Sequence, residues 1–549
     1  MAHFLLKHKS IHSNEPESFL FSNLRNIQLS QNWMLFISGS NTTYDYYEKD
    51  GNFICAIGYV CNSDSYSMKD TLSECLIRFE EKNLVSFKKE LLGQFIIIIK
   101  KNSSVFIFDD FIGGRNIFYN SEGNLVTSSF AWAEESIGFG YDFLNYYKTL
   151  EYLALREVKY PAWLGQQTMN KKINWLLPYE YIKFNINQEN FEVKRILFEI
   201  DNIKESNLNI LSEKLIQNLS RVIERKEFLN SKIGCSLTGG RDSRLVATLA
   251  ANIFPKCRYR TAISKSNIKS LKDLKVAKKI SRINRIKLDI YEFTLSTHEK
   301  LFRTLTEDMI PAYNITITPL IINNNNYALT LGGIFGSEIF EPILVKLIAT
   351  YNQVIAARIK KSIASNNQFI DQLMESITGQ FTDIKRHYHL KEADERDYIR
   401  IFQLLITARY SSFITAAMAQ FGYDLEPYGS YPLVELALQI DSSLWGYKKS
   451  LAGDATVQKV SLYKISRAAS RVLAYSSYRP VMPFCLRSSP KYLWGYFLHI
   501  NDWITRKISD VTQSRQKLSI PGFNYASDGW YEYYLNRIDK YKAINHSIQ

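Results

Sequence analysis

The chain passes from a strand to a helix across two adjacent glycines, in the stretch KIGCSLTGGRDSRLVATLAA at 232–251. A short apolar run precedes the glycines, and apolar residues at helical spacing follow them. Two further strands are expected at 259–264 and 286–295, with a basic amphipathic helix between them at 269–287. Strands that alternate with helices predict a parallel sheet with helices packed on its faces. This alternation sets the α/β class of the second half of the chain.

Gly239 and Gly240 at this turn predict a site for phosphate groups. Glycine has no Cβ, so its backbone can approach a ligand closely, and the N-terminus of the next helix offers N–H groups and a dipole that favour anions. Asp242 would repel a phosphate unless it holds a cation that also contacts the phosphates, so the cluster predicts a nucleotide bound with Mg²⁺. Three hydroxyl groups can add hydrogen bonds, those of Ser236, Thr238 and Ser243.

The same turn differs from two common nucleotide motifs. A Walker A loop would end in Lys followed by Ser or Thr, and a Rossmann fingerprint would separate its glycines. The alternative without a ligand is a glycine-rich turn closed by a capping Ser or Asp.

The first part of the chain predicts a layered antiparallel sheet domain. Short β-branched and aromatic runs bounded by Gly, Asn, Asp and Ser continue to about residue 133, with one helix at 71–81. From about residue 341 the pattern is mostly helical. We therefore expect a front domain over 1–140, a connector over 141–206 and an α/β domain over 207–549, whose C-terminal part is helical.

Four stretches resemble the asparagine synthetase-like family of N-type ATP pyrophosphatases. LTGGRDSR (237–244) resembles the family's SGGxDS pyrophosphate loop (PP-loop), and LGGIFGSEIF (331–340) its second loop, SGxGxDELF. PYGSYPLVELALQI (427–440) resembles its PFLDxxLVExA segment, and 91–129 is similar to class II glutamine amidotransferases. The resemblance implies an Ntn-type front domain and ATP cleavage between the α and β phosphates. It implies ATP and pyrophosphate contacts at Ser236, Leu237, Thr238, Gly239, Gly240, Arg241, Asp242, Ser243, Arg244, Gly332 and Gly333.

Several positions depart from that family. An active class II glutaminase carries Cys directly after the initiator Met, whereas this sequence has Ala2, so we expect a silent front domain, as in β-lactam synthetases and lasso-peptide macrolactam synthetases. Ser337 stands where the family has an acidic metal ligand, so Glu338 is expected to supply that carboxylate beside Asp242. Ile334 replaces a Glu or Tyr. Ser430 stands in place of an Asp. Lys464 is the nearest match to the lysine that steadies the acyl-adenylate in this family, one residue out of step, so the resemblance implies a catalytic role for Lys464 as well as for Glu338.

Charge and cysteine content exclude some classes of function. The net charge of +14 fits a solvated basic surface, or attraction to nucleic acid, membrane or an acidic substrate. The amidotransferase-like front domain argues against a tRNA-modifying enzyme. The six cysteines form no CxxC pair, and no apolar run has the length of a membrane span. A cytoplasmic location is the resulting expectation.

Together these features predict an ATP- and Mg²⁺-dependent ligase that adenylates a carboxylate and forms an amide. The expected substrate is a peptide or other specialised metabolite, and a precursor peptide or an ammonia-supplying protein is a candidate partner. Two alternatives stay open. One is amidation of an amino acid or uronic acid with external ammonia, and the other is a nucleotide-binding scaffold without catalysis.

Overall fold

A computed structural model gives the fold of the protein. The residues that it describes are 3–9, 11, 24–38, 43–62, 65–138, 141–157, 163–264, 268–294, 298, 301–302, 305–306, 317–340, 348–362, 367–392, 394–441, 444, 455–474, 479–480, 517–520 and 523–526.

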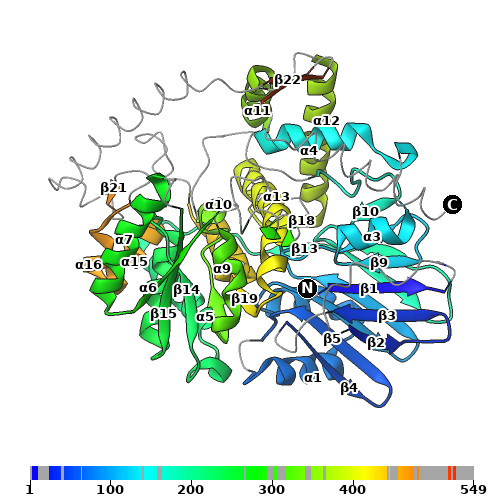
Figure 1. Ribbon diagram of the computed structural model, residues 1–549, viewed down its shortest axis with the longest axis horizontal. Helices are drawn as coiled ribbons and strands as arrows, with labels where there is room; N and C mark the ends of the chain where they lie inside the picture. The colour runs from blue at the N-terminus through cyan, green and yellow to red at the C-terminus, as the bar shows by residue number, and fades with distance from the viewer. Residues whose placement is uncertain are drawn as a thin grey trace.

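The front domain is a sandwich of two antiparallel sheets, each with six described strands (Figure 1). The first sheet has the order β10 (Ile173–Trp175), β8 (Phe118–Asn120), β9 (Leu125–Thr127), β1 (His3–His8), β3 (Trp33–Ser38), β2 (Leu24–Gln28). The second has the order β12 (Glu192–Arg195), β11 (Glu180–Asn185), β7 (Ser104–Asp109), β6 (Phe95–Lys101), β5 (Asn52–Gly58), β4 (Tyr44–Lys49). The layered antiparallel front domain expected from the sequence is confirmed.

Strand β6 shows why its sequence forms an inner layer. Its residues FIIIIKK are β-branched or aromatic up to the two lysines. Ile96 and Ile98 pack in the core between the two sheets, and Ile97 and Ile99 lie on the opposite face in a second core, because side chains alternate along a strand. Burial on both faces explains the unbroken apolar run.

Helices cover both outer faces of the sandwich. Helix α1 (Met68–Arg78) contacts β4 and β5, whereas α3 (Phe130–Ile137) contacts β8 and β9. Helix α2 (Leu84–Glu90) joins the same core as α1. Helix α1 begins three residues before the expected position 71, because Ser67 caps it: Asp70 N donates to Ser67 Oγ and Ser67 N donates to Asp70 Oδ2.

The two front sheets extend past residue 140. Strands β10, β11 and β12 lie within 141–206, the segment expected to be a connector, and they pair with β8 and β7 of the front domain. The strand sequence IKFN of β11 completes the hydrogen bonding of β7 along its free edge. The front layers therefore include chain as far as Arg195.

The second half contains the expected parallel sheet. Its order is β16 (Leu288–Glu292), β15 (Cys257–Ile263), β14 (Ile233–Ser236), β17 (Leu329–Leu331), β19 (Tyr423–Leu425), and all neighbouring pairs run parallel. The helices next to it in the chain are α5 (Leu208–Ile223), α6 (Asp242–Ile253) and α7 (Ile268–Asn284). The fold class predicted from the alternation of strands and helices is confirmed.

The rest of the described chain is mainly helical, as expected. Its helices are α4 (Tyr146–Glu157), α9 (Thr318–Ile322), α10 (Gly336–Phe340), α11 (Ile348–Ser362), α12 (Asn367–His387), α13 (Glu395–Met418), α14 (Tyr431–Gln439), α15 (Thr456–Ile465) and α16 (Arg467–Ser470). Among the described helices, α13 alone is long and apolar enough to span a membrane, by length and composition. Of its most apolar window, 89% is buried inside the protein.

Helix α13 also joins the two halves of the molecule. It contacts α9, α10, α12 and β19, and it lies in the middle of the structure (Figure 1). Near its C-terminal end, Arg115 Nη1 of the front domain donates to the Thr415 carbonyl over 2.8 Å, and Thr415 Oγ1 donates to the Gly114 carbonyl over 2.9 Å. The front sandwich is thus bonded directly to the core helix of the second half.

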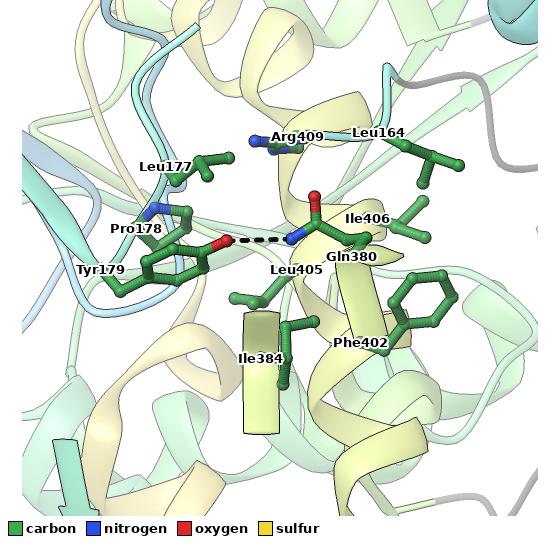
Figure 2. A pocket seen from close by; sticks show the side chains of 10 residues that line it. All are labelled: Leu164, Leu177, Pro178, Tyr179, Gln380, Ile384, Phe402, Leu405, Ile406 and Arg409. Carbon is green, nitrogen blue, oxygen red and sulfur yellow. Dashed lines mark hydrogen bonds between the residues drawn. The ribbon is translucent and has the colours of Figure 1, made fainter. Parts of the chain in front are cut away.

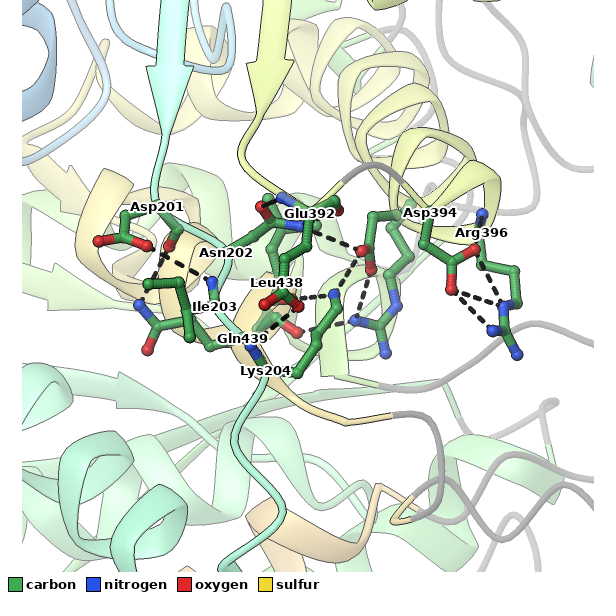
Figure 3. Close-up of polar contacts among 12 residues, drawn as sticks. Asp201, Asn202, Ile203, Lys204, Glu392, Asp394, Arg396, Leu438 and Gln439 are labelled. Atoms are coloured by element: carbon green, nitrogen blue, oxygen red, sulfur yellow. Dashed lines mark hydrogen bonds and ion pairs between the residues drawn. The ribbon is translucent and has the colours of Figure 1, made fainter.

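The chain between the two halves is fastened by a buried ion pair (Figure 3). Lys204 Nζ contacts the carboxylate of Asp397, which is fully buried, and it also donates to the Leu438 carbonyl over 2.6 Å. Arg400 Nη1 lies 3.8 Å from the other Asp397 oxygen and donates to the Ala437 carbonyl. Two cations around one buried carboxylate hold the connector against α13 and α14.

Candidate functional site

The glycine turn lies at the carboxyl end of β14, between that strand and the first residue of α6. Beside it, the second loop follows the carboxyl end of β17, the neighbour of β14 in the sheet. In open α/β sheets, ligands bind outside the carboxyl ends of the strands. The two loops that resemble nucleotide-binding segments therefore meet at the edge of the sheet where a ligand is expected.

The first loop is held by its own hydroxyl groups and by one acid from α7. Thr238 Oγ1 and Ser243 Oγ lie 3.0 Å apart, and Ser243 Oγ also accepts from Thr238 N over 3.2 Å. Gly239 N donates to Asp273 Oδ1 over 3.2 Å, and Gly240 N donates to Thr238 Oγ1 over 3.2 Å. Asp273 thus fixes the backbone of the turn.

Ser236 and Leu237 serve the sheet rather than the open side of the turn. Ser236 Oγ accepts from Arg260 Nε over 3.3 Å, and Leu237 N donates to the Arg260 carbonyl over 2.9 Å. The Leu237 side chain is fully buried. These two expected contact residues therefore orient the strand end, and the exposed part of the loop begins at Thr238.

Arg241 and Asp242 form the charged part of the turn, and an amide from α15 contacts both. Arg241 Nε donates to Gln458 Oε1 over 3.3 Å, and Gln458 Nε2 donates to Asp242 Oδ1 over 2.9 Å. Arg241 Nε also lies 3.7 Å from Asp242 Oδ1. Burial raises the pKa of Asp242 above its ordinary value, while Arg241 and hydrogen bonds from Gln458 and Ser337 oppose that rise.

Arg244 does not face a ligand, contrary to the expectation that it holds pyrophosphate. It is fully buried, and its guanidinium donates to three backbone carbonyls: Ala469 O and Val472 O from Nη1, and Gly239 O from Nη2. Burial lowers the pKa of Arg244 to about 9. Its side chain ties the turn to the segment after α15, so its role is structural.

The second loop packs closely on the first. A Cβ on Gly333 would lie 2.6 Å from Ser243 N, so a larger residue would push the loops apart. Phe335 has a left-handed backbone with φ of 74°, which is strained for an aromatic residue, and its side chain is fully buried. The two loops are therefore held together at the N-terminus of α6, whose first N–H groups have no intrahelical acceptor.

The oxygen atoms at this edge suit Mg²⁺. The side chain of Ser337 helps to lower the pKa of the Asp242 carboxylate, and half-buried Glu338 is the next residue on α10. Mg²⁺ is usually held by one or two carboxylates together with phosphate oxygens and water. Among the described residues, no three His, Cys, Asp or Glu side chains form a metal-binding group. A metal ion at Asp242 would therefore need phosphate oxygens among its ligands.

Lys464 lies away from the turn. Its Nζ donates to Glu213 Oε1 over 2.9 Å and to the Asn209 carbonyl over 3.3 Å, both on α5. Gln458, which contacts the turn, lies six residues before Lys464, or about 9 Å away along the axis of α15. Lys464 is also the more exposed of the two lysines on α15: its side chain is 28% exposed, whereas Lys459 is 8% exposed. The structure does not bring Lys464 to the site for which the sequence proposed it.

Two polar residues of the site were missed from the sequence. Gln458 carries no motif, and only its contacts to Arg241 and Asp242 identify it. Glu426 directly precedes the recognised 427–440 segment, and its carboxylate accepts the Ile334 N–H of the second loop over 2.7 Å. Burial and neighbouring Asp424 raise the pKa of Glu426 well above its ordinary value. The one signal in the sequence for Glu426 was its place directly after a buried strand.

A separate cavity lies between the front domain and helices α12 and α13 (Figure 2). Tyr179, Gln380 and Arg409 supply its polar groups, and Gln380 Nε2 donates to the Tyr179 hydroxyl over 3.2 Å. Only about 10 Å³ is open to the centre of a water molecule, which is about the room that one water needs. The cavity is therefore too small for a nucleotide or a peptide, and the two loops remain the candidate site.

Comparisons with known proteins give little further identification. No family model and no curated protein matches the chain. A structure of the allosteric regulatory enzyme of purine biosynthesis aligns with a TM-score of 0.21 and 10% identity, over 48% of this chain and 59% of that one. Glutamine phosphoribosylpyrophosphate amidotransferase from B. subtilis, complexed with ADP and GMP, aligns with a TM-score of 0.20 and 9% identity, over 66% and 80%. This chain thus spans less than two thirds of the first protein. The fold class follows from the strand pairing in the structure of this protein.

Proposed function

We propose that this protein is an ATP-dependent, AMP-forming carbon–nitrogen ligase that adenylates a substrate carboxylate and then forms an amide. One observation carries the proposal: the Thr238–Ser243 turn and the Gly332–Glu338 loop pack together at the carboxyl ends of adjacent parallel strands. Both loops meet the N-terminus of α6, where N–H groups and the helix dipole favour phosphate. This arrangement supplies hydrogen-bond donors for the phosphates of ATP.

The residues of the turn would hold the phosphates of ATP. The N–H groups at the start of α6, the Thr238 hydroxyl and the half-buried Arg241 guanidinium supply donors on the exposed side. Asp242 and Glu338 would hold Mg²⁺, which would neutralise charge on the phosphates when it is bound. Gln458 and Ser337 would keep the Asp242 carboxylate oriented. Positioning and charge neutralisation would supply much of the rate.

The reaction would proceed in two balanced steps. An oxygen of the substrate carboxylate attacks the α-phosphorus of ATP, and the bond to the bridging oxygen breaks, releasing pyrophosphate and leaving an acyl-adenylate. An amine then attacks the acyl carbon, AMP leaves with the electron pair of the C–O bond, and the amine loses a proton. The carboxylate substrate would be a small molecule or a peptide, with a precursor peptide as the favoured case.

The front domain would not hydrolyse glutamine. Its three cysteines, Cys55, Cys61 and Cys75, are all buried. Burial raises the pKa of the Cys61 thiol to about 11 and that of Cys75 to about 12. A glutaminase nucleophile must form a thiolate readily. The amine would therefore come from free ammonia, from a partner protein or from the substrate itself. Ala2 lies outside the described residues.

A second function, nucleotide binding without catalysis, is favoured by one residue. Ser337, whose side chain acts on the pKa of Asp242, stands at a position where the resembled family places a second carboxylate. One fewer carboxylate means weaker metal binding at this edge. In this case the protein would bind ATP but would not cleave it.

Exchange of labelled pyrophosphate into ATP tests the proposal. The protein is incubated with ATP, Mg²⁺ and a panel of carboxylates: amino acids, uronic acids and peptides with acidic side chains. Exchange that depends on one carboxylate and that is absent from Asp242→Asn supports the ligase. ATP binding without exchange for any carboxylate would overturn it in favour of the scaffold.

A further inference from the structure

Gln94 of the front domain makes both of its amide hydrogen bonds to one residue of the second half. Gln94 Nε2 donates to the Glu426 carbonyl over 3.0 Å, and Glu426 N donates to Gln94 Oε1 over 2.7 Å. Gln94 is 1% exposed and directly precedes β6, the inner strand of the front sandwich. A buried amide with both ends bonded fixes the position of its partner backbone.

Glu426 passes this constraint to the second loop. Its Oε2 accepts the Ile334 N–H over 2.7 Å, and its Oε1 occupies the space where a Cβ of Gly332 would stand. The loop is also bonded to the same strand end, since Gly332 N donates to the Leu425 carbonyl over 3.1 Å. The position of the 332–334 backbone therefore follows the position of Glu426.

The second loop in turn sets the opening of the phosphate-binding turn. Gly333 rests on the backbone of Ser243, the second residue of α6, with no room for a side chain between them. The Gly336 carbonyl and the Asp242 carboxylate both accept from the same Gln458 amide, over 3.4 and 2.9 Å. A shift of the second loop would thus move the groups that face the phosphates.

We propose that Gln94 is a positioning residue through which the front domain holds the second loop against the phosphate-binding turn. This inference rests on the proposed function, because the position of the second loop affects activity only if the turn binds phosphates. It also explains what a front domain without a reactive thiol contributes to the molecule: it is the rigid body from which one side of the nucleotide site is fixed.

Three variants of the full-length chain test the proposal. Gln94→Met keeps the size of the side chain and removes both hydrogen bonds. Glu426→Leu removes the acceptor of the Ile334 N–H. Tyr59→Phe is the matched control, because it removes another bond between the two halves, from the Tyr59 hydroxyl to Glu227 Oε1 over 2.7 Å, and leaves both Gln94–Glu426 bonds in place.

Hydrogen–deuterium exchange without nucleotide is the main measurement. We expect peptides covering 331–338 to exchange roughly tenfold faster in Gln94→Met, because both hydrogen bonds that fix the Glu426 backbone are lost, and at the wild-type rate in Tyr59→Phe. A fourth variant that combines Gln94→Met with Glu426→Leu should exchange no faster than Glu426→Leu alone, because both changes act on one chain of contacts. Unchanged exchange in Gln94→Met, or an equal rise in Tyr59→Phe, would overturn the proposal.

Nucleotide binding forms the second arm and separates the two proposals. We expect Gln94→Met to bind Mg²⁺ and ATP roughly tenfold more weakly than Tyr59→Phe does. If the wild-type protein binds no ATP, the proposed function fails while the exchange result still decides the role of Gln94. If Gln94→Met loses its cooperative thermal transition, Gln94→Asn, which keeps the amide but shortens the side chain, replaces it in the same exchange experiment; faster exchange over 331–338 than in Tyr59→Phe supports the proposal, and equal exchange overturns it.

Discussion

The side-chain amide of Gln458 donates to Asp242 Oδ1 over 2.9 Å and so joins α15 to the first residue of α6. The oxygen of the same amide accepts from Arg241 Nε. One neutral side chain thus orients the anion and the cation of the turn without adding charge. Under the proposed function, the same two groups would contact the phosphates and the metal ion.

Replacing Gln458 should weaken nucleotide binding. Gln458→Leu keeps the approximate volume but removes both contacts, so Arg241 and Asp242 are free to pair with each other more closely. We expect the affinity for ATP with Mg²⁺ to fall roughly tenfold, the effect of about one net hydrogen bond. Isothermal titration measures it. Ser461→Ala is the control, because Ser461 lies on the same helix but bonds to the Ser212 carbonyl of α5. Equal affinities for the two variants would contradict the prediction.

Asp242→Asn should abolish the part of ATP binding that depends on Mg²⁺ and leave the fold intact. The change keeps the shape and the acceptor for Gln458, but it removes the charge that a divalent cation needs. In the wild-type protein, burial raises the pKa of Asp242, so the carboxylate becomes protonated at a higher pH than an ordinary Asp. Binding should therefore weaken as the pH is lowered, and it should recover when the pH is raised.

Titrations of ATP at several pH values, with Mg²⁺ or with EDTA, check this prediction. The asparagine variant should bind equally with and without Mg²⁺, and its weak affinity should not follow the acidic limb of the wild-type profile. A wild-type level of pyrophosphate exchange in Asp242→Asn would show that Asp242 is not the metal ligand.

Substitutions of Arg244 and Arg241 should distinguish an effect on the stability of the fold from an effect on ATP binding. Arg244→Met leaves the buried carbonyls of Gly239, Ala469 and Val472 without their donor, so the free energy of unfolding should fall by about 3 kcal/mol. Arg241→Met removes a half-buried cation and should change that free energy by no more than about 1 kcal/mol. Urea denaturation measures both values. Affinity for ATP should show the larger loss in Arg241→Met, and the reverse order would restore Arg244 as a phosphate ligand.

Sequence patterns anticipated the fold well because local and overall preferences agree there. The apolar run of β6 and the strand–turn–helix around Gly239 follow from side-chain alternation and glycine placement, and the structure has both. The ends of elements were harder to predict. The basic helix stops at Asn284 rather than at 287, since Arg285 adopts a left-handed backbone with φ of 55°. Such a residue has no clear sequence signal when it is not glycine.

The site was anticipated only where a motif lies in one stretch of chain. The turn and the second loop, which their motifs singled out, lie against each other, since a Cβ on Gly333 would lie 2.6 Å from Ser243 N. By contrast, the partners that orient them come from distant segments. Gln458 lies 216 residues after Asp242, and Gln94 lies 332 residues before Glu426. A single sequence carries no record of such pairs, because a buried glutamine has the same local signature as an exposed one.

Lys464→Ala should leave both exchange activity and ATP affinity unchanged. Its ammonium bonds to Glu213, whose side chain is 63% exposed, so the pair should contribute at most about 1 kcal/mol to stability. Pyrophosphate exchange measured beside Glu213→Ala, which breaks the same pair, checks this. A large loss of exchange in Lys464→Ala alone would return this lysine to the reacting groups.

The buried ion pair between Lys88 and Asp109 should make the stability of a variant depend on pH. Lys88 Nζ lies 2.8 Å from Asp109 Oδ1, the two side chains are 0% and 2% exposed, and Lys88 also donates to the Pro178 carbonyl. Burial, opposed by Lys88, raises the pKa of Asp109 to about 7. The folded protein therefore holds this proton more tightly than the unfolded chain, so the contribution of Asp109 to stability falls as pH rises from about 4 to about 7.

Lys88→Met removes the attraction that opposes the rise in pKa, so Asp109 should stay protonated to a higher pH. At pH 8 the variant must bury an unpaired charge or take up a proton, and its free energy of unfolding should be lower by about 3–5 kcal/mol. At pH 5 the acid is neutral and the loss should be smaller. Urea denaturation at both pH values measures the difference. Lys88→Met combined with Asp109→Asn removes the titrating group, so the double variant should show the same loss at pH 5 and pH 8. A pH-dependent loss in the double variant would assign the effect to another group, such as neighbouring Asp110, which accepts the Gly114 N–H.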